Sequence, residues 1–168
     1  TYAEPFRNLF SLRSFKLWDA RGEFLGSAYT WWVLLDFIKQ RPIRLDKCEL
    51  MNAFMEQLTD ELPTDVKIPA VTAPTMEEPW KVRWQDLDVN DHTNHAVYFN
   101  WALDTVPDEV PDSMAPVFVE GEFLHPIPRT RVRCLTQELP CEEGRGFLHS
   151  LRHQEDDTEY AKLSSKWR

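Results

Sequence analysis

The sequence predicts an α+β fold in which an antiparallel sheet curls around a buried helix. Three observations predict it: a strand-like segment at 81–85, a segment at 94–106 with apolar residues on several helical faces, and strand-like segments after it. A helix that is apolar on several sides must be covered almost all round. Successive strands without intervening helices favour an antiparallel sheet as that cover. The strands that follow the helix are expected at about 117–124, 131–138, 146–154 and 158–167.

The N-terminal part of the chain predicts a β-hairpin and then a short helix. Residues 8–18 and about 23–36 are rich in aromatic and β-branched residues, and Asp19–Gly22 between them has turn composition. Asp46, with Glu49 three residues on, can cap the helix. Core packing explains its apolar stripe, which consists of Leu50, Met51, Phe54, Met55 and Leu58.

A proline-rich stretch divides the chain. Residues 59–79 contain four prolines and no apolar periodicity, so they predict a linker. Residues 1–58 then form the C-terminal part of a first domain, and residues 80–168 form a second domain.

A short internal repeat suggests that the two parts are related. Ser11-Leu12-Arg13 and Ser150-Leu151-Arg152 each precede a hairpin. Each return strand carries a glutamate followed eight residues later by a tryptophan: Glu23 with Trp31, and Glu159 with Trp167. The first copy has no room for an opening strand and a buried helix before its hairpin. We therefore expect the chain to be N-terminally incomplete.

Composition excludes several classes of function. A formal net charge of −9 argues against a nucleic-acid partner. The longest apolar run, residues 29–35, is too short for a membrane span, and no signal or other targeting segment is visible. Cys48, Cys134 and Cys141 are odd in number and lack C-x-x-C spacing, so a disulfide framework or zinc site is not expected. A reducing compartment follows from this cysteine usage.

Basic residues nevertheless cluster locally. Arg129, Arg131 and Arg133 alternate along one predicted strand, and a second cluster contains Lys39, Arg41 and Arg44. A solvated strand or loop face is the favoured interpretation of each cluster.

Asp86–His92 is the polar stretch richest in candidate chemistry. Asp86, Asp88 and Asn90 have the spacing of the first three ligands of an EF-hand calcium loop. Asp91 stands where that loop requires glycine and Val97 where it requires glutamate, so an EF-hand is rejected. His92 and His95 have no third ligand at a recognisable spacing, so no metal or other cofactor is predicted. His149 and His153 are expected at the surface.

A second interpretation of this stretch is a turn into the buried helix that serves chemistry. A helix N-terminus presents unpaired N–H groups and a positive dipole end, which suits an oxygen that becomes negative as water attacks a carbonyl. Asp88, Asn90 and His92 would supply an anion, an orienting donor and a proton acceptor. The alternative, a turn that merely caps the helix with Asn94 as the cap, stays open.

The segment from Val82 to Asp104 resembles the signature of plant plastid and bacterial acyl-ACP thioesterases. In that family Asp-x-Asn-x-His and a following Tyr, Trp and acidic residue open the second of two hotdog domains. The N-terminal part also resembles the family, through Arg13-Ser-Phe with Asp19, Gly22 and Gly26, and through Trp32–Asp36 and Arg41-Pro42. The resemblance implies a double hotdog whose first domain is incomplete here.

The resemblance also implies a site. Asp88, Asn90 and His92 match the family's catalytic set, in which the Asp either polarises the site or attacks the thioester directly. Two positions depart from the pattern. His95 stands where the family has a second Asn, and His125, followed by Pro126, stands where it has a catalytic Glu. His125 could act as a general base in its place, and the alternatives are Glu120 and Glu122 through a shifted strand. No cysteine nucleophile is proposed.

The implied function is hydrolysis of fatty acyl-ACP thioesters, which releases free fatty acid and ends chain elongation. Acyl carrier protein bearing a fatty acyl chain is the implied partner, and a homodimer stays open. The implied location is the bacterial cytoplasm or, in a plant, the plastid stroma. Two alternatives remain: an acyl-CoA thioesterase of the same fold, and a catalytically silent acyl-binding module.

Overall fold

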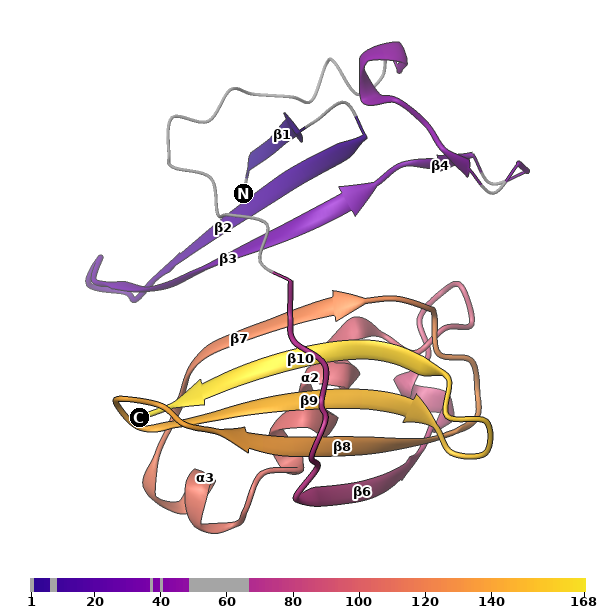
Figure 1. The fold of residues 1–168 in the computed structure, drawn as a ribbon. Helices are drawn as coiled ribbons and strands as arrows, with labels where there is room; N and C mark the ends of the chain where they lie inside the picture. Colours follow the sequence, from indigo (N-terminus) through magenta and orange to yellow (C-terminus); the bar gives the residue numbers. More distant parts are fainter. Residues whose placement is uncertain (1, 7–8, 37, 40, 49–66) are drawn as a thin grey trace. The chain divides into compact units, whose positions relative to one another are not determined.

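The computed structural model describes residues 2–6, 9–36, 38–39, 41–48 and 67–168. The chain divides into two compact units, Thr1–Asp65 and Val66–Arg168, which we call unit 1 and unit 2 (Figure 1). Unit 1 contains a three-stranded antiparallel sheet in the order β1-β2-β3. These strands are β1 (Tyr2–Phe6), β2 (Phe10–Trp18) and β3 (Phe24–Val33). A two-stranded pair, β4 (Leu35–Asp36) and β5 (Arg41–Pro42), and the 3-10 turn η1 (Leu45–Lys47) follow.

The predicted N-terminal hairpin is confirmed as β2 and β3. Its turn is closed by Asp19, whose carboxylate accepts the backbone N–H groups of Arg21 and Glu23, both at 2.8 Å. Gly22 has a φ of 83°, which a residue without a Cβ adopts at little cost. Asp46 lies inside η1, while the helix expected after it lies mostly at 49–58, outside the described residues.

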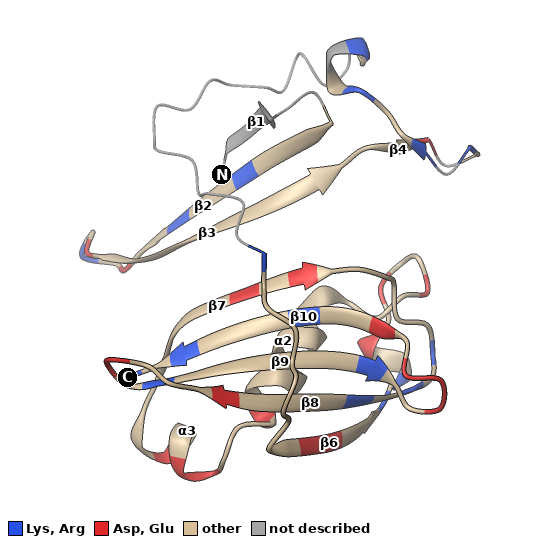
Figure 2. Cartoon of the chain, viewed as in Figure 1, with Lys and Arg blue, Asp and Glu red and all other residues tan. Residues whose placement is uncertain are grey.

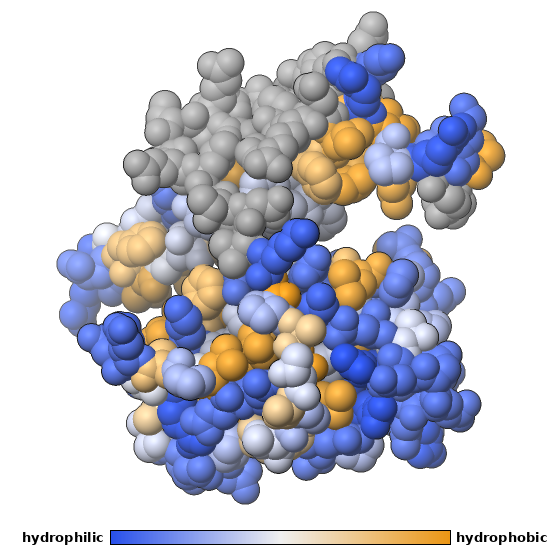
Figure 3. All heavy atoms as spheres, viewed as in Figure 1, coloured by the Kyte–Doolittle hydropathy of each residue, from blue (hydrophilic) through white to orange (hydrophobic). Residues whose placement is uncertain are grey.

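Unit 1 exposes much of its apolar surface. Among its described residues, Leu12 and Leu45 are the buried apolar side chains. Trp18, Phe24 and Leu25 are each more than half exposed, and Figure 3 shows orange, apolar surface on this unit. The described part of unit 1 therefore has strands but little core.

Unit 2 holds a five-stranded antiparallel sheet in the order β6-β8-β9-β10-β7. Its helix α2 (His95–Asp104) packs against β8, β9 and β10 (Figure 1). The described strands of unit 2 are β6 (Met76–Lys81), β7 (Pro116–Phe123), β8 (Arg131–Leu139), β9 (Arg145–His153) and β10 (Glu159–Trp167). Two short helical elements are the 3-10 turn η2 (Trp84–Asp86) and α3 (Glu109–Ser113).

The core of unit 2 lies between α2 and one face of the sheet. Tyr98, Trp101 and Ala102 of α2 are buried against strand residues that include Val132, Cys134, Leu151, Ala161 and Leu163. This arrangement is the antiparallel sheet around a helix that the sequence predicts, and it is a hotdog fold.

The opposite face of the sheet is also covered. Residues 67–75 cross it as an extended segment (Figure 1), and Ile68 and Val71 pack against Leu135 and Leu148. Gln137 holds the segment by accepting the N–H groups of residues 72 and 73 at 2.9 and 3.0 Å. These residues belong to the stretch expected to be a linker, and they contribute to the packing of unit 2.

One expectation about the fold is wrong, and one sequence match is not reproduced in the strand registers. The strand expected at 81–85 lies at Met76–Lys81 instead, because the next residues turn as η2, where Asp86 bonds the backbone and side chain of Arg83. The internal repeat does not mark equivalent positions. Leu12 faces Trp31 across its hairpin, whereas Leu151 faces Ala161 and Trp167 faces Arg145. Both hairpins exist, but the residues that match in sequence have different cross-strand partners in the two hairpins.

Candidate active site

The stretch from Asp88 to His92 forms a tight loop between two bridged residues. Leu87 and Thr93 pair as an isolated antiparallel bridge, and the N–H of Asp88 donates to the carbonyl oxygen of His92 at 2.7 Å. Asp91 closes the loop in the left-handed conformation, with a φ of 58°. The loop therefore presents its side chains from a fixed backbone just before α2.

The Asp88 carboxylate is stabilised as an anion inside this loop. Its Oδ1 atom accepts the N–H of Asn90 at 2.8 Å and the N–H of His92 at 3.2 Å. The N–H of Asn90 lowers the pKa of Asp88 most, burial raises it to a smaller extent, and the N–H of His92 lowers it further. Both backbone bonds use Oδ1, so Oδ2 is the oxygen that lies outside them.

Capping of α2 is carried out by a different residue. The side chain of Asn94 accepts the N–H of Ala96 at 2.9 Å, as the capping interpretation expects. Because Asn94 supplies this cap, Asp88, Asn90 and His92 are not needed for it. The capping and chemical interpretations of the stretch therefore apply to different residues of one turn.

Asp86 anchors the start of the loop. Its buried carboxylate accepts the backbone N–H of Arg83 at 2.7 Å and pairs with the Arg83 guanidinium at 3.2 Å. Its carbonyl oxygen accepts the N–H of Asn94 at 2.8 Å. Asp86 thus connects the η2 turn, which precedes the loop, to Asn94, which follows the Leu87–Thr93 bridge.

Aromatic rings adjoin the loop at the start of α2. His95 stacks on Phe123 of β7, with ring centroids 3.9 Å apart and an angle of 5° between the planes. Partial burial lowers the pKa of His95, and the negative charge of Asp88 opposes this effect. Burial raises the pKa of Tyr98 to about 12, and Asp88 contributes to the rise. The carboxylate thus acts electrostatically on both side chains.

The segment that contains His125 is tied to the loop through its backbone. Thr93 donates to the carbonyl oxygen of Ile127, and the Ile127 N–H donates to the Tyr98 hydroxyl at 3.0 Å. His125 itself is exposed, and its N–H donates to the carbonyl oxygen of Tyr160 at 3.1 Å. Across the described residues, no hydrogen bond, ion pair or ring contact joins its side chain to Asp88, Asn90 or His92.

Glu120 and Glu122 lie on the other face of β7. Gly121 and Phe123 face α2, since a Cβ on Gly121 would lie 3.1 Å from the Phe99 ring. Alternation along a strand places the two glutamates on the opposite side. Glu120 there accepts the Ser164 hydroxyl at 2.7 Å. The shifted-strand alternatives to His125 are therefore not supported by the geometry.

The prediction for His149 is wrong, and one neighbour of the loop, Thr93, was not predicted from the sequence. His149 is buried between hydroxyl groups and is not at the surface. The aromatic surroundings of Asp88 include His95 and Tyr98, and Thr93 fixes the loop to the next strand segment. The tyrosine was visible in the family signature, but long-range bonding of Thr93 leaves no local sequence signal.

The described residues offer neither a cluster of metal ligands nor a helix that could span a membrane. No group of three His, Cys, Asp or Glu side chains there could hold a metal ion. No helix in the same part of the chain is long and apolar enough to cross a membrane.

Comparison with known proteins gives consistent results. Residues 70–168 match the family "Acyl-ACP thioesterase C-terminal domain". The chain is 32% identical over 159 residues to acyl-[acyl-carrier-protein] hydrolase FATB2, chloroplastic, of Cuphea viscosissima, which covers 88% of the chain and 38% of that protein. It is 33% identical to a chloroplastic palmitoyl-acyl carrier protein thioesterase of Cuphea hookeriana, with 88% of the chain and 37% of that protein covered. The chain thus spans less than two fifths of the length of these relatives.

Solved structures agree on the fold. The 12:0-ACP thioesterase from Umbellularia californica superposes with a TM-score of 0.83 at 24% identity, over 99% of the chain and 63% of that protein. An acyl-ACP thioesterase from Bacteroides thetaiotaomicron superposes with a TM-score of 0.76 at 17% identity, over 99% of the chain and 66% of that protein. The family match, which covers more than half of the sequence, shows that this chain belongs to the acyl-ACP thioesterases.

Proposed function

We propose that the complete protein hydrolyses fatty acyl thioesters carried on acyl carrier protein and releases the free fatty acid. The observation that carries the proposal is the Asp88–His92 loop, which holds an anionic carboxylate, an amide and an imidazole directly before the N-terminus of α2. Family membership and the names of the relatives support the same reaction.

In the proposed mechanism, Asp88 is a positioning and electrostatic group. Its Oδ1 atom accepts the N–H groups of Asn90 and His92, so the carboxylate fixes the shape of the loop and keeps a negative charge just before α2. His92 is exposed and can accept a proton from the attacking water. The Asn90 amide and the start of α2 would stabilise the oxygen of the thioester carbonyl as it becomes negative. Water adds to the carbonyl carbon, the C–S bond breaks, and the thiol leaves with a proton.

Replacement of Asp88 by asparagine tests this assignment. Asn keeps an oxygen that can accept the Asn90 and His92 N–H groups, so the loop is retained while the charge is lost. We expect Asp88→Asn to lower kcat for acyl-ACP hydrolysis by roughly a hundredfold or more, and His92→Ala by a similar factor. Release of free fatty acid from a series of saturated acyl-ACPs is the measurement.

Asp91 provides the matched control. It lies in the same loop, is exposed, and has a left-handed conformation that asparagine tolerates. Asp91→Asn removes the same charge and should leave kcat within about twofold of the parent. Equal losses in Asp88→Asn and Asp91→Asn would assign the effect to general electrostatics and contradict the role of Asp88.

A catalytically silent acyl-binding module is the second candidate, and one observation favours it. His125 replaces the glutamate expected from the family, and its side chain has no contact with the loop within the described residues. A complete protein that binds acyl chains but releases no free acid from acyl-ACP or acyl-CoA would establish this candidate. Hydrolysis of acyl-CoA in preference to acyl-ACP would instead establish the acyl-CoA thioesterase.

The finer assignments of partner and location are also proposals. The chloroplastic relatives support the plastid stroma, if the source is a plant, and a fluorescent fusion of the complete protein would test it. A net charge of −9 supports the absence of a nucleic-acid partner. A homodimer remains a prediction, which sedimentation of the complete protein would check.

A further inference from the structure

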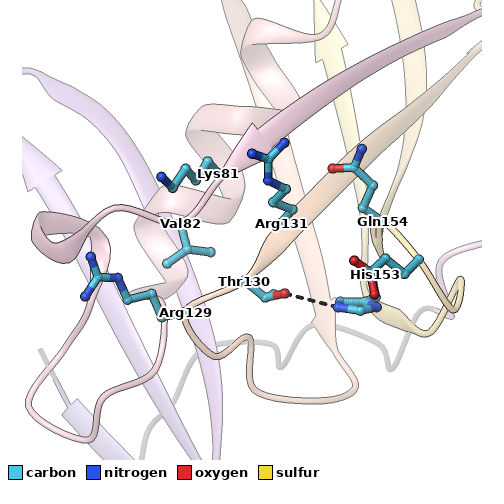
Figure 4. Close-up of a pocket in the computed structure, with 8 residues that line it drawn as sticks. Lys81, Val82, Arg129, Thr130, Arg131, His153 and Gln154 are labelled. Atoms are coloured by element: carbon cyan, nitrogen blue, oxygen red, sulfur yellow. Dashed lines mark hydrogen bonds between the residues drawn. The ribbon is translucent and has the colours of Figure 1, made fainter.

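A pocket of about 290 Å³ opens at the ends of neighbouring strands in unit 2, and its lining includes none of the residues of the Asp88–His92 loop. The end of β6, the segment that leads into β8 and the turn after β9 line it together (Figure 4). Most of its polar lining comes from Lys81, Arg129, Thr130, Arg131, His153 and Gln154.

Among the described residues, no carboxylate forms an ion pair with the positive charges of this pocket. Lys81, Arg129 and Arg131 make no ion pair and no cation–π contact in the part of the chain that the structure describes. Glu155 is the single carboxylate of the lining, and it pairs with none of the three. The contrast is with the ion-paired arginines of unit 2, which are Arg83, Arg133, Arg145, Arg152 and Arg168.

This contrast occurs in a chain with an excess of carboxylates. The sequence has 28 acidic residues against 19 lysines and arginines. Acidic residues are frequent in the loops of unit 2 (Figure 2), yet none of those that the structure describes forms an ion pair with these three cations. Three like charges around one pocket repel each other, so an anion bound between them would be stabilised.

The pocket rests on a fixed backbone. The N–H of Val82 donates to the carbonyl oxygen of Thr130 at 3.0 Å, and that of Gln154 donates to the carbonyl oxygen of Arg131 at 3.1 Å. The Thr130 hydroxyl lies 3.0 Å from His153 Nε2, and the other ring nitrogen lies 3.0 Å from an Asp156 oxygen. These bonds hold the strand ends together, while the three cations remain available to a ligand.

We propose that this pocket binds a phosphate group. Guanidinium groups present paired N–H donors that match phosphate oxygens, and a lysine adds a point charge. Three cations suit the charge of a phosphate better than that of a single carboxylate. Thioesters on acyl carrier protein and on coenzyme A both lie at the end of an arm that carries phosphate. The substrate's phosphate is therefore the expected source, and this assignment of the source rests on the proposed function.

Binding of inorganic phosphate tests the site without any catalysis. Phosphate added to the complete protein should shift the NMR signals of residues 129–131 and 153–154 in a saturable way. Arg129→Gln with Arg131→Gln should raise the dissociation constant by roughly tenfold or more, because each lost cation removes a charge-assisted bond. Lys166→Gln with Arg168→Gln removes the same charge outside the pocket and should leave phosphate binding within about twofold.

Kinetics distinguish the two sources of phosphate. If the substrate's phosphate occupies the pocket, the Arg129/Arg131 double variant should raise KM for acyl-ACP with little change in kcat. Inorganic phosphate should also compete with substrate. Phosphate binding with unchanged KM would support a phosphate site that takes free phosphate.

The proposal is overturned if phosphate produces no saturable shift at these residues, or if the shift persists equally in the Arg129/Arg131 double variant. Either result is distinguishable from failure of the proposed function. An inactive protein can still bind phosphate, and an active one can lack the site.

Discussion

Thr93 donates two hydrogen bonds to a single acceptor, the carbonyl oxygen of Ile127. Its backbone N–H donates at 2.8 Å and its hydroxyl at 3.0 Å, and both residues are buried. Thr93 directly follows His92, and Ile127 lies two residues after His125. Thr93 therefore connects the two parts of the candidate site that are distant in sequence, and its own side chain takes no part in the proposed chemistry.

Thr93→Val should weaken this connection with little change in shape. The hydroxyl bond is lost while the backbone bond remains, so the free energy of unfolding should fall by about 1 kcal/mol. Movement of His92 relative to β7 should lower kcat several-fold. Urea unfolding and acyl-ACP hydrolysis measure the two effects. Thr105→Val is the matched control, because Thr105 is also buried and its hydroxyl donates to a carbonyl oxygen, that of Trp101. If both variants lose the same activity, the effect of Thr93 is only structural.

Asp91 should tolerate glycine better than alanine. Its φ of 58° lies in the left-handed region, where a Cβ costs about 1–2 kcal/mol in residues that lack a compensating side chain. Asp91→Ala should therefore destabilise the loop and reduce kcat. Asp91→Gly should retain more of the stability and more of the activity. Thermal unfolding and kcat for the pair provide the comparison. Similar values for alanine and glycine would show that the loop adopts another conformation during turnover.

The strands and the main helix could be predicted because their patterns are local. β2, β3 and the strands after α2 follow from runs of aromatic and β-branched residues between turns, and α2 follows from its apolar faces. The four prolines of residues 59–79 predict a linker, and one of them, Pro79, lies in β6. A proline is tolerated in β6 because this strand lies at the edge of the sheet. The position of a strand within a sheet cannot be inferred from the sequence of that strand alone.

The loop of the candidate site was partly predictable because part of its pattern is also local. The abundance of Asp and Asn indicates a turn before a helix, and Asn94 caps α2 as expected. The Thr93–Ile127 connection spans 34 residues and depends on how β7 ends. The burial of His149 was missed because β9 is covered on both faces. Residues 145–151 therefore show no buried-exposed alternation from which the position of a single histidine could be inferred.

Stability should depend on pH through His149. Its two ring nitrogens lie 2.8 Å from the Thr136 hydroxyl and 3.0 Å from the Ser165 hydroxyl, and burial lowers its pKa to about 4. In the unfolded chain a histidine titrates near 6.5. Between these values the unfolded state binds more protons, so stability is complete above about pH 6.5 and is lost as the pH falls toward 4.

The change attributable to His149 should be about 2 kcal/mol between pH 7 and pH 5. Urea unfolding of the parent and of His149→Gln at pH 7 and at pH 5 gives the change in unfolding free energy for each protein. The difference between the two changes is the contribution of His149. His125→Gln, which changes an exposed histidine, is the control and should follow the parent. The same pH dependence in His149→Gln would contradict the assignment to this residue.

His125 should contribute to turnover and should be replaceable by glutamate. It stands where the family resemblance places a carboxylate, and its segment is fixed to the loop through Ile127. Its side chain is exposed, so substitution should change stability by less than about 0.5 kcal/mol. We expect His125→Ala to lower kcat by roughly tenfold or more and His125→Glu to restore it, because either an imidazole or a carboxylate can accept a proton. Equal kcat for the parent, His125→Ala and His125→Glu would remove this position from the site and leave Asp88, Asn90 and His92 as its proposed members.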